Sequence, residues 1–400
     1  ETDVRLGEDV LLNPDASLVT GIMPETLRRE GIPEVQAWEE IMRRFTVPET
    51  CVVGYNSLRF DDEFVRYGLY RHLFDPYARE WQSGCSRWDL IDLVRATGAL
   101  RREGIHWPQD EDGLPVYKLE ELTKANDIGH SNAHDALADV HATIAMARLI
   151  KQQQPKLFDY YFGLRNKRAV REMLEPYGAH LLVHVSGMNP RERFGVAPVV
   201  SVTRHPTNTN SVIVVDLAQD LTPLLEQSED EIRDQLFTRG PHARPPLKEV
   251  KINRCPFIAP IDVLNDENQR RLQLNMREIK ERVRRLKQPG LLQKIRRVYT
   301  QPQQRVAEDA DAALYQGFLQ DEDRSRCQHF HANRREGDWL SMDFNDPRLI
   351  PLAQRMKARS HPDLLDAEEQ AQWQNFVAEK LYGDGDWLNL RRFHARLDEL

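Results

Sequence analysis

Cys51-Val52-Val53-Gly54-Tyr55-Asn56-Ser57-Leu58-Arg59-Phe60-Asp61 is the stretch in which a short apolar run gives way to an acidic helix start. The run at residues 51–55, β-branched at its centre, predicts a buried strand. Residues 61–74 then predict a helix with four residues toward a core: Phe64, Val65, Leu69 and Leu73. Because strands alternating with helices are typical of layered folds, the stretch predicts an α/β first domain.

The rest of this first region is helical in pattern. Helices are predicted at residues 88–96, 119–125 and 133–151, and Trp88 is expected in the core. The last is the most regular, because apolar residues recur every three or four positions: Leu137, Val140, Ile144 and Ala147. A polar run and Pro155 end it, so we place the domain boundary after residue 154.

Two further domains are predicted beyond that boundary. After a helical bridge at residues 158–174, short β-branched runs predict strands at 181–185, 198–202 and 212–215, and a helix at 267–287 follows. This pattern fits a small barrel with helical insertions over residues 155–305. Residues 306–400 predict helices at 312–319, 348–359, 368–382 and 387–397.

Composition excludes several classes of protein. The 400 residues carry a formal net charge of -8, which disfavours a histone-like protein that coats nucleic acid. The four cysteines are scattered, so neither a disulfide framework nor a zinc site is indicated. No long apolar segment predicts a membrane span and no signal peptide is recognised at the start, so a cytoplasmic protein is expected.

Asn132-Ala133-His134-Asp135-Ala136-Leu137-Ala138-Asp139 opens the most regular helix. Five helical positions turn through about 500°, so His134 must lie before or at the first turn to reach over Asp139. Such a histidine is suited to deprotonate an attacking water beside a carboxylate-bound metal. The alternative is an acidic first turn that interacts favourably with the helix dipole.

Asp61 follows the predicted strand at residues 51–55. A carboxylate there projects from a strand end, where α/β sheets build their sites. The alternative is that Asp61 or Asp62 only caps the helix.

Taken together, the two motifs resemble motifs II and III of the DEDDh exonucleases, about 75 residues apart. In that superfamily four acids hold two divalent metal ions. The resemblance implies that Asp61 and Asp139 are metal ligands and that His134 is the general base. Two Mg²⁺ ions per site are implied, with Mn²⁺ as a possible substitute.

Further stretches are similar to the bacterial exonuclease I family, at residues 54–63, 86–90, 112–115, 122–126, 131–139, 155–160, 183–188 and 314–318. The resemblance implies an α/β ribonuclease H-like exonuclease domain, with a mixed sheet and flanking helices, over residues 1–154. An SH3-like β-barrel domain and an α-helical C-terminal domain would follow. The implied activity is processive 3′→5′ release of 5′-mononucleotides from single-stranded DNA, in DNA repair and recombination, by a monomer.

One family motif is not found where it is expected. The first motif, Asp-x-Glu on an opening strand, should supply the other two acids and should precede Glu1. The pattern does occur at Asp366-Ala367-Glu368, but there it is expected to be a coincidence on a solvated helix. Because the chain does not begin with methionine, we expect that the native N-terminus is missing from this sequence.

The resemblance also suggests residues that contact DNA and a partner. Arg59, Arg87, Lys118 and Lys124 are candidates for phosphate contacts in a single-strand groove, although each suits an ordinary surface charge equally well. The expected partner is the single-strand DNA-binding protein, whose acidic C-terminal tail would contact Arg101 and Tyr160. Both could instead simply pack or be hydrated.

Two rival functions remain open from the sequence. An HD-type metal phosphohydrolase would use His134-Asp135 with His72 or His106, but the strand at Val52 argues against an all-helical fold. A non-catalytic single-stranded-DNA-binding relative would have lost the first metal motif.

Overall fold

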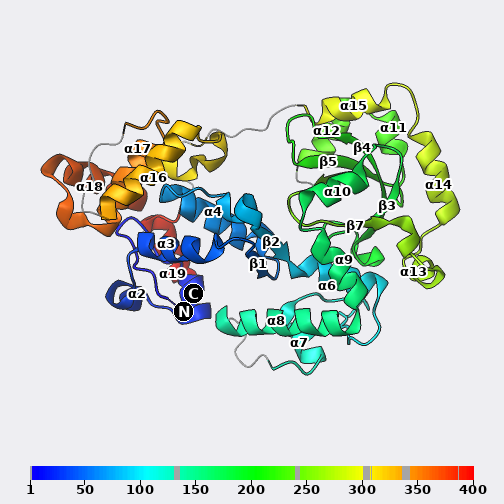
Figure 1. Cartoon of the computed structure of the whole chain (residues 1–400), viewed down its shortest axis with the longest axis horizontal. Helices are drawn as coiled ribbons and strands as arrows, with labels where there is room; N and C mark the ends of the chain where they lie inside the picture. The colour runs from blue at the N-terminus through cyan, green and yellow to red at the C-terminus, as the bar shows by residue number, and fades with distance from the viewer. Residues whose placement is uncertain are drawn as a thin grey trace. The chain divides into compact units, whose positions relative to one another are not determined.

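The structure is a computed structural model that describes residues 2–129, 136–238, 244–300, 307, 309–335, 343–385 and 387–400. The chain forms two compact units. The first contains residues 1–51, 59–85 and 304–400, and the second contains residues 52–58 and 86–303 (Figure 1). The region expected to form the exonuclease domain therefore contributes to both units. Among the described helices, none has the length and apolar character that crossing a membrane requires.

In the second unit, β1 (Cys51–Gly54) pairs with β2 (Ser86–Asp89), and the strand predicted at residues 51–55 is confirmed. The helix predicted at 88–96 begins later, because Trp88 and Asp89 belong to β2. Asp89 caps the following helix, α6 (Leu90–Leu100), by accepting a hydrogen bond from the Ile91 amide. Trp88 is buried as predicted.

The other helices of this part are α7 (Leu119–Ala125), as predicted, and α8, which is described from Ala136 to Gln153. The expected core face of α8 is wrong. Leu137, Val140 and Ile144 are 50%, 53% and 42% exposed, and the buried residues are Ala142, Thr143, Met146 and Ile150. Both sides of the helix carry apolar residues, so the repeat alone did not identify the side that packs.

An antiparallel sheet forms the centre of the second unit (Figure 1). Its strands are β3 (Leu181–Val185), β4 (Val196–Arg204), β5 (Ser211–Asp216), β6 (Leu247–Lys251) and β7 (Phe257–Pro260), in the order β6-β5-β4-β3-β7. The three predicted strands are therefore confirmed, two of them with longer bounds. Val183, Ile213 and Phe257 are completely buried.

Helices precede, interrupt and follow this sheet: α9 (Pro155–Gly163), α10 (Lys167–Leu174), α11 (Thr222–Glu226), α12 (Glu229–Phe237) and α15 (Leu291–Val298). The helix expected at residues 267–287 is two helices, α13 (Asp266–Arg271) and α14 (Met276–Arg285). They separate at Gln273, whose φ is 52°, and the Asn275 side chain caps α14. Such a backbone cannot continue an α-helix.

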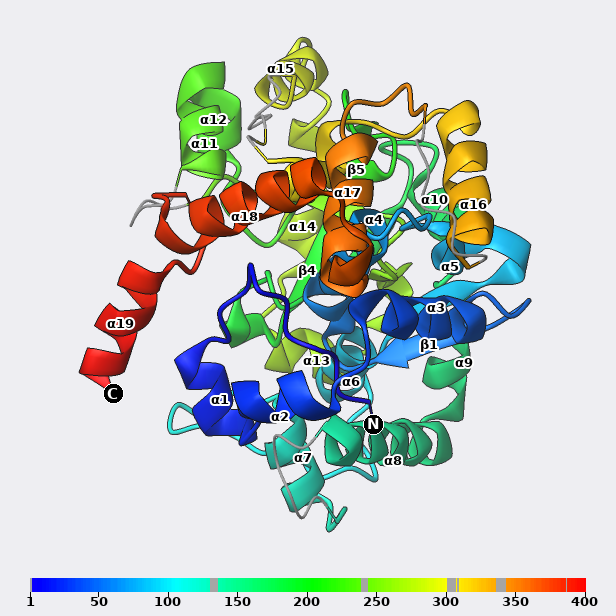
Figure 2. The ribbon, with the colours of Figure 1, turned by 90° about the vertical axis from the view of Figure 1, so that its left-hand side faces the viewer.

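The first unit is helical in its described residues. Short helices α1 (Pro14–Thr20) and α2 (Pro24–Glu30) precede α3 (Glu34–Phe45), α4 (Asp61–Arg71) and α5 (Ala78–Trp81). The C-terminal region adds the 3₁₀-helix η5 (Ala310–Gln316), α16 (Asp321–Arg335), α17 (Leu349–Ser360), α18 (Ala367–Tyr382) and α19 (Leu390–Glu399). Figure 2 shows α17 beside α3.

These two regions share one hydrophobic core. Val35 of α3, Tyr70 of α4 and Leu352 of α17 are among its buried members. Leu69 and Leu73 are buried as predicted, but Phe64 is 67% exposed. At Asp366-Ala367-Glu368 the Asp366 side chain caps α18 by accepting from the Glu368 and Glu369 amides, so this Asp-x-Glu is a helix start.

Buried charges are paired within this unit. Arg359 donates to Asp9 at 2.7 Å and to Asp311 at 3.1 Å. Although burial opposes it, Arg359 and neighbouring arginines hold the pKa of Asp311 well below its usual range. His72 is fully buried, and its Nδ1 lies 2.7 Å from the Gly68 carbonyl oxygen. Burial lowers the pKa of His72 to about 4.

We predict that acid destabilises the first unit through His72. Its pKa lies below the value of about 6.5 in an unfolded chain, so the unfolded state binds more protons between those values. The stabilisation is complete above pH 6.5 and is lost as the pH falls to about 4, with a total of ~3 kcal/mol. Thermal unfolding at pH 7 and pH 4.5 should show a smaller loss of Tm for His72→Asn than for the native protein. Equal losses would contradict this role.

Candidate functional site

The loop between β1 and α4 is held by a buried carboxylate. Asp89 accepts hydrogen bonds from the amides of Asn56 at 2.7 Å, Leu58 at 3.1 Å and Ile91 at 3.0 Å. Burial raises the pKa of Asp89 to about 6, while the three N–H donors favour the charged form. Asp89 lies within residues 86–90, one of the stretches similar to the exonuclease I family. The sequence predicts no role for it, because an aspartate that caps a helix and one that anchors a loop look alike in sequence.

Asp61 is the first residue of α4, and Phe60 occupies the N-cap position without a side-chain hydrogen bond. The Asp61 side chain is exposed, and it forms no hydrogen bond or ion pair with any other residue in the described part of the chain. Partial burial raises its pKa, and the neighbouring Asp62 carboxylate raises it further. The helix-cap interpretation therefore does not account for Asp61.

Asp139 lies in the first described turn of α8 and is exposed. Its backbone carbonyl accepts from the Thr143 hydroxyl at 2.8 Å. His134 and Asp135 lie outside the described residues. Asp61 belongs to the first unit and Asp139 to the second, and each is described within its own unit. Over the described ranges, no three His, Cys, Asp or Glu side chains gather in a group that could hold a metal ion.

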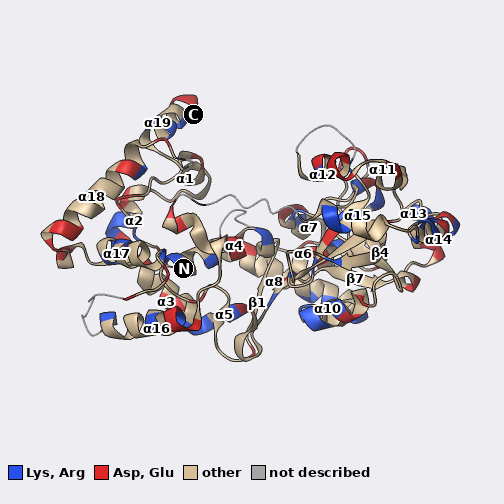
Figure 3. Cartoon of the chain, turned by 90° about the horizontal axis from the view of Figure 1, so that it is seen from above, with Lys and Arg blue, Asp and Glu red and all other residues tan. Residues whose placement is uncertain are grey.

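The four candidate DNA contacts differ in exposure. Arg59 ends a 3₁₀ turn (Ser57–Arg59) in an exposed position. Lys118 at the N-cap of α7 and Lys124 in its last turn are exposed too. Arg87 is buried, and its Nη2 donates to the Asn253 carbonyl at 3.0 Å, which favours a structural role. Figure 3 marks the lysines and arginines in blue and shows several of them on α10.

Arg101 and Tyr160, the candidate partner contacts, both bond to the same segment of the second unit. Arg101 Nη2 donates to the Val263 carbonyl at 3.1 Å, and the Tyr160 hydroxyl donates to the Ile258 carbonyl at 2.7 Å. Tyr160 remains 37% exposed, and partial burial raises its pKa to about 12. The structure thus attaches these two residues, distant in sequence, to the segment from β7 to Val263.

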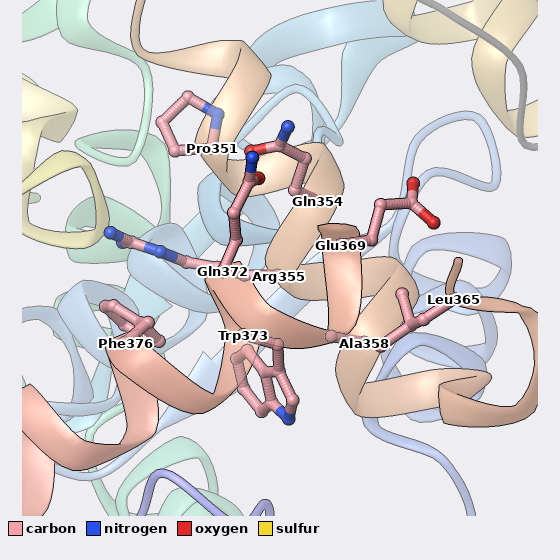
Figure 4. A pocket seen from close by; sticks show the side chains of 9 residues that line it. All are labelled: Pro351, Gln354, Arg355, Ala358, Leu365, Glu369, Gln372, Trp373 and Phe376. Carbon is pink, nitrogen blue, oxygen red and sulfur yellow. The ribbon is translucent and has the colours of Figure 1, made fainter. Parts of the chain in front are cut away.

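Two hollows in the first unit involve other residues. A cavity of about 150 Å³ lies between α17 and α18, where the Arg355 guanidinium stands 3.8 Å from the centre of the Phe376 ring (Figure 4). A larger cavity of about 540 Å³ is lined by aromatic residues, including Tyr77 and Phe318. Neither cavity is lined by a predicted site residue.

The HD-type alternative loses one of its two candidate metal ligands, His72. His72 is fully buried in the first unit and bonds to backbone, while His106 is exposed in the second. The described strands also contradict an all-helical fold.

Family comparisons match almost the whole chain. Residues 1–147 match a family described as Exonuclease. Residues 165–301 match the Exonuclease I SH3-like domain, and residues 308–400 match the Exonuclease I C-terminal domain. The chain belongs to the exonuclease I family. The predicted class of fold is thereby confirmed, while the boundaries 1–154, 155–305 and 306–400 stay predictions.

Relatives of this exonuclease I family member are similar over nearly its full length. It is 43% identical to exodeoxyribonuclease I of Escherichia coli, over 96% of this chain and 83% of the relative. A crystal structure of E. coli exonuclease I in complex with a dA16 oligonucleotide matches with a TM-score of 0.92 and 40% identity, covering 99% of this chain and 85% of that one. Exonuclease I from Methylocaldum szegediense matches with a TM-score of 0.92 and 42% identity, over 99% and 85%.

Replacing Asp89 should loosen the loop that leads to Asp61. Asp89→Asn puts an NH₂ group where a carboxylate oxygen accepts, so at least one buried amide loses its partner, at about 1–3 kcal/mol. We expect a lower free energy of unfolding in urea and reduced nuclease activity. Asp230→Asn is the control, because the Asp230 side chain is 91% exposed. Equal stability of the two variants would contradict the anchoring role.

Proposed function

We propose that this member of the exonuclease I family removes 5′-mononucleotides from the 3′ end of single-stranded DNA. The observation that carries the proposal is the match of three exonuclease I domain families along nearly the whole chain. E. coli exonuclease I has been crystallised with single-stranded oligonucleotides, and 85% of that chain is covered here. The role in DNA repair and recombination belongs to the same proposal.

The chain is a metal-dependent exonuclease, and a zinc-bound form of the E. coli exonuclease I–DNA complex is known. We assign the metal as Mg²⁺, two ions per site, with Mn²⁺ as a substitute. Asp61 fits such an ion because its carboxylate is exposed and uncommitted among the described residues, and hard cations prefer oxygen donors. When bound, the ions polarise water and stabilise charge on the phosphate oxygens.

The chain's own residues then have distinct roles in the proposed reaction. Asp61 and Asp139 present carboxylate oxygens from helix starts, and His134 accepts the proton of the attacking water. Arg59, Lys118 and Lys124 are exposed cations suited to contact backbone phosphates. Arg87 is omitted from this set because its guanidinium is buried and bonded to Asn253.

The proposed partner is the single-strand DNA-binding protein. Exonuclease I has been solved together with this protein, abbreviated SSB, at 40% identity to the present chain. Arg101 supplies a cation and Tyr160 a partly exposed ring, and both bond to the segment from β7 to Val263. This combination is suited to an acidic C-terminal tail. We place the enzyme in the cytoplasm, where its four free cysteines would stay reduced.

The first test uses a 5′-labelled single-stranded oligonucleotide, the full-length protein and Mg²⁺, with EDTA as the metal-free arm. We expect a ladder shortened from the 3′ end with Mg²⁺ only. His134→Ala should lower kcat by about 10²–10⁴-fold, the usual contribution of a general base, without changing Tm. His106→Ala is the matched control, because His106 is exposed. Binding without shortening would instead support the non-catalytic DNA-binding relative.

A second test addresses the partner surface. Arg101→Ala should weaken binding of a fluorescent acidic peptide, with the sequence of the tail of the single-strand DNA-binding protein, by about tenfold, because one charge-assisted contact is lost. Fluorescence anisotropy measures the affinity, and digestion of bare DNA should be unaffected. Arg277→Ala controls for loss of a positive charge at an exposed site. Equal affinities of the two variants would remove Arg101 from the surface.

A further inference from the structure

Three consecutive acids, Asp61, Asp62 and Glu63, occupy the first turn of α4. Successive helical residues point about 100° apart, so their carboxylates face three directions. Asp61 and Glu63 also have the Asp-x-Glu spacing that a pair of metal ligands could use. The proposed function needs a metal ligand here, and the contacts of each acid decide which of the three is available.

Asp62 is committed to the interior of the first unit. It is 6% exposed, and its Oδ1 accepts from Arg79 Nη2 at 2.7 Å. Arg79 is 1% exposed, so the ion pair is removed from water. A carboxylate held in this way cannot turn outward without leaving a buried guanidinium uncompensated.

Glu63 is committed as well, on another side of the helix. It accepts from Arg66 Nη1 at 2.9 Å and from the hydroxyl of Tyr315. Tyr315 comes from η5 in the C-terminal region, and its ring meets Tyr67 edge to face at 5.8 Å. A link from the C-terminal region therefore ends two residues after Asp61.

Helix α5 holds the same turn through two neighbouring residues. Arg79 pairs with Asp62. Arg66 forms a bidentate ion pair with Glu80, in which Nε donates to Oε1 at 2.7 Å and Nη2 donates to Oε2 at 2.9 Å. Asp62 and Arg66 stand one helical turn apart, so these pairs fix both the position of α4 and its rotation about its axis. Asp61 alone of the three acids is exposed and forms no hydrogen bond or ion pair with another described side chain.

We propose that Arg66, Arg79 and Tyr315 are positioning residues that fix the direction of Asp61 through their contacts with Asp62 and Glu63. This inference rests on the proposed function, which makes Asp61 a ligand. It adds that Glu63, despite its spacing, holds the helix and not the metal. It also gives the C-terminal region a part in catalysis through the Tyr315 hydroxyl.

Metal affinity tests which acid is the ligand. Mn²⁺ binding to the full-length protein, followed by electron paramagnetic resonance of the free ion, should weaken about tenfold or more in Asp61→Asn. Arg66 donates to Glu63 Oε1 and the Tyr315 hydroxyl donates to Oε2. Glu63→Gln keeps one oxygen that accepts from Arg66 and offers an NH₂ group to the Tyr315 oxygen, so its affinity should stay within about twofold of the native value. Equal losses in the two variants would overturn the assignment.

Kinetics test the positioning role. Tyr315→Phe removes one hydroxyl and keeps the ring, so we expect kcat to fall about tenfold while KM for DNA is unchanged. Tyr382→Phe is the matched control, because Tyr382 is 74% exposed. Arg79→Lys, which keeps the charge, should retain more activity than Arg79→Met. A raised KM with native kcat would make Tyr315 a DNA contact, and unchanged kinetics would remove it from the site; either result overturns the positioning role.

The two readouts separate this inference from the proposed function. If the Mn²⁺ affinities of the native protein, Asp61→Asn and Glu63→Gln differ as expected but the native protein does not shorten DNA, the proposed function fails. The roles of Asp61 and Glu63 then still stand. If the native protein shortens DNA but Asp61→Asn and Glu63→Gln lose Mn²⁺ equally, the proposed function stands and this inference fails.

Discussion

Arg359 lies buried between Asp9 and Asp311, and much of the first unit follows from the need to pair such charges. Its side chain is 4% exposed, and an unpaired guanidinium at that depth would be strongly destabilising. Asp9 comes from the start of the chain and Asp311 from the C-terminal region. The requirement therefore joins segments about 300 residues apart, and the hydrophobic core shared by α3, α4 and α17 forms around the same junction.

The same rule governs the acidic start of α4. A helix N-terminus favours negative charge, so three acids in its first turn are expected by themselves. Once Arg79 and Arg66 are buried beside them, two of these acids must serve as partners. The acid left exposed is then determined by which cations lie beneath the helix. Local stability and the direction of Asp61 are thus set by one group of contacts.

Sequence patterns predicted correctly whether most segments form a helix or a strand. They did not predict which face of a helix is buried or at which residue some elements begin. The strand at residues 51–55, helix α7 and strand β3 were identified because their periodicity and bounding residues agree. The exposed side of α8 was mistaken for its core, since Leu137 and Met146 are equally apolar and only tertiary packing distinguishes them. Trp88 was assigned to a helix because propensity cannot foresee its pairing with β1.

For the candidate site, the sequence predicted the motif residues but not the residues that hold them in place. Motif spacing singled out Asp61, Asp139 and His134, because helix starts and strand ends can be read locally. Asp89, Arg79 and Tyr315 were missed, because an anchor is defined by what it bonds to across the fold and not by its neighbours in sequence. Arg87 shows the converse: a cation in a family-like stretch suggested a DNA contact, yet its burial against Asn253 uses that charge to hold β2 in place. Residue type limits the chemistry that is possible, and the partners that each side chain meets decide which part of that chemistry remains for a ligand.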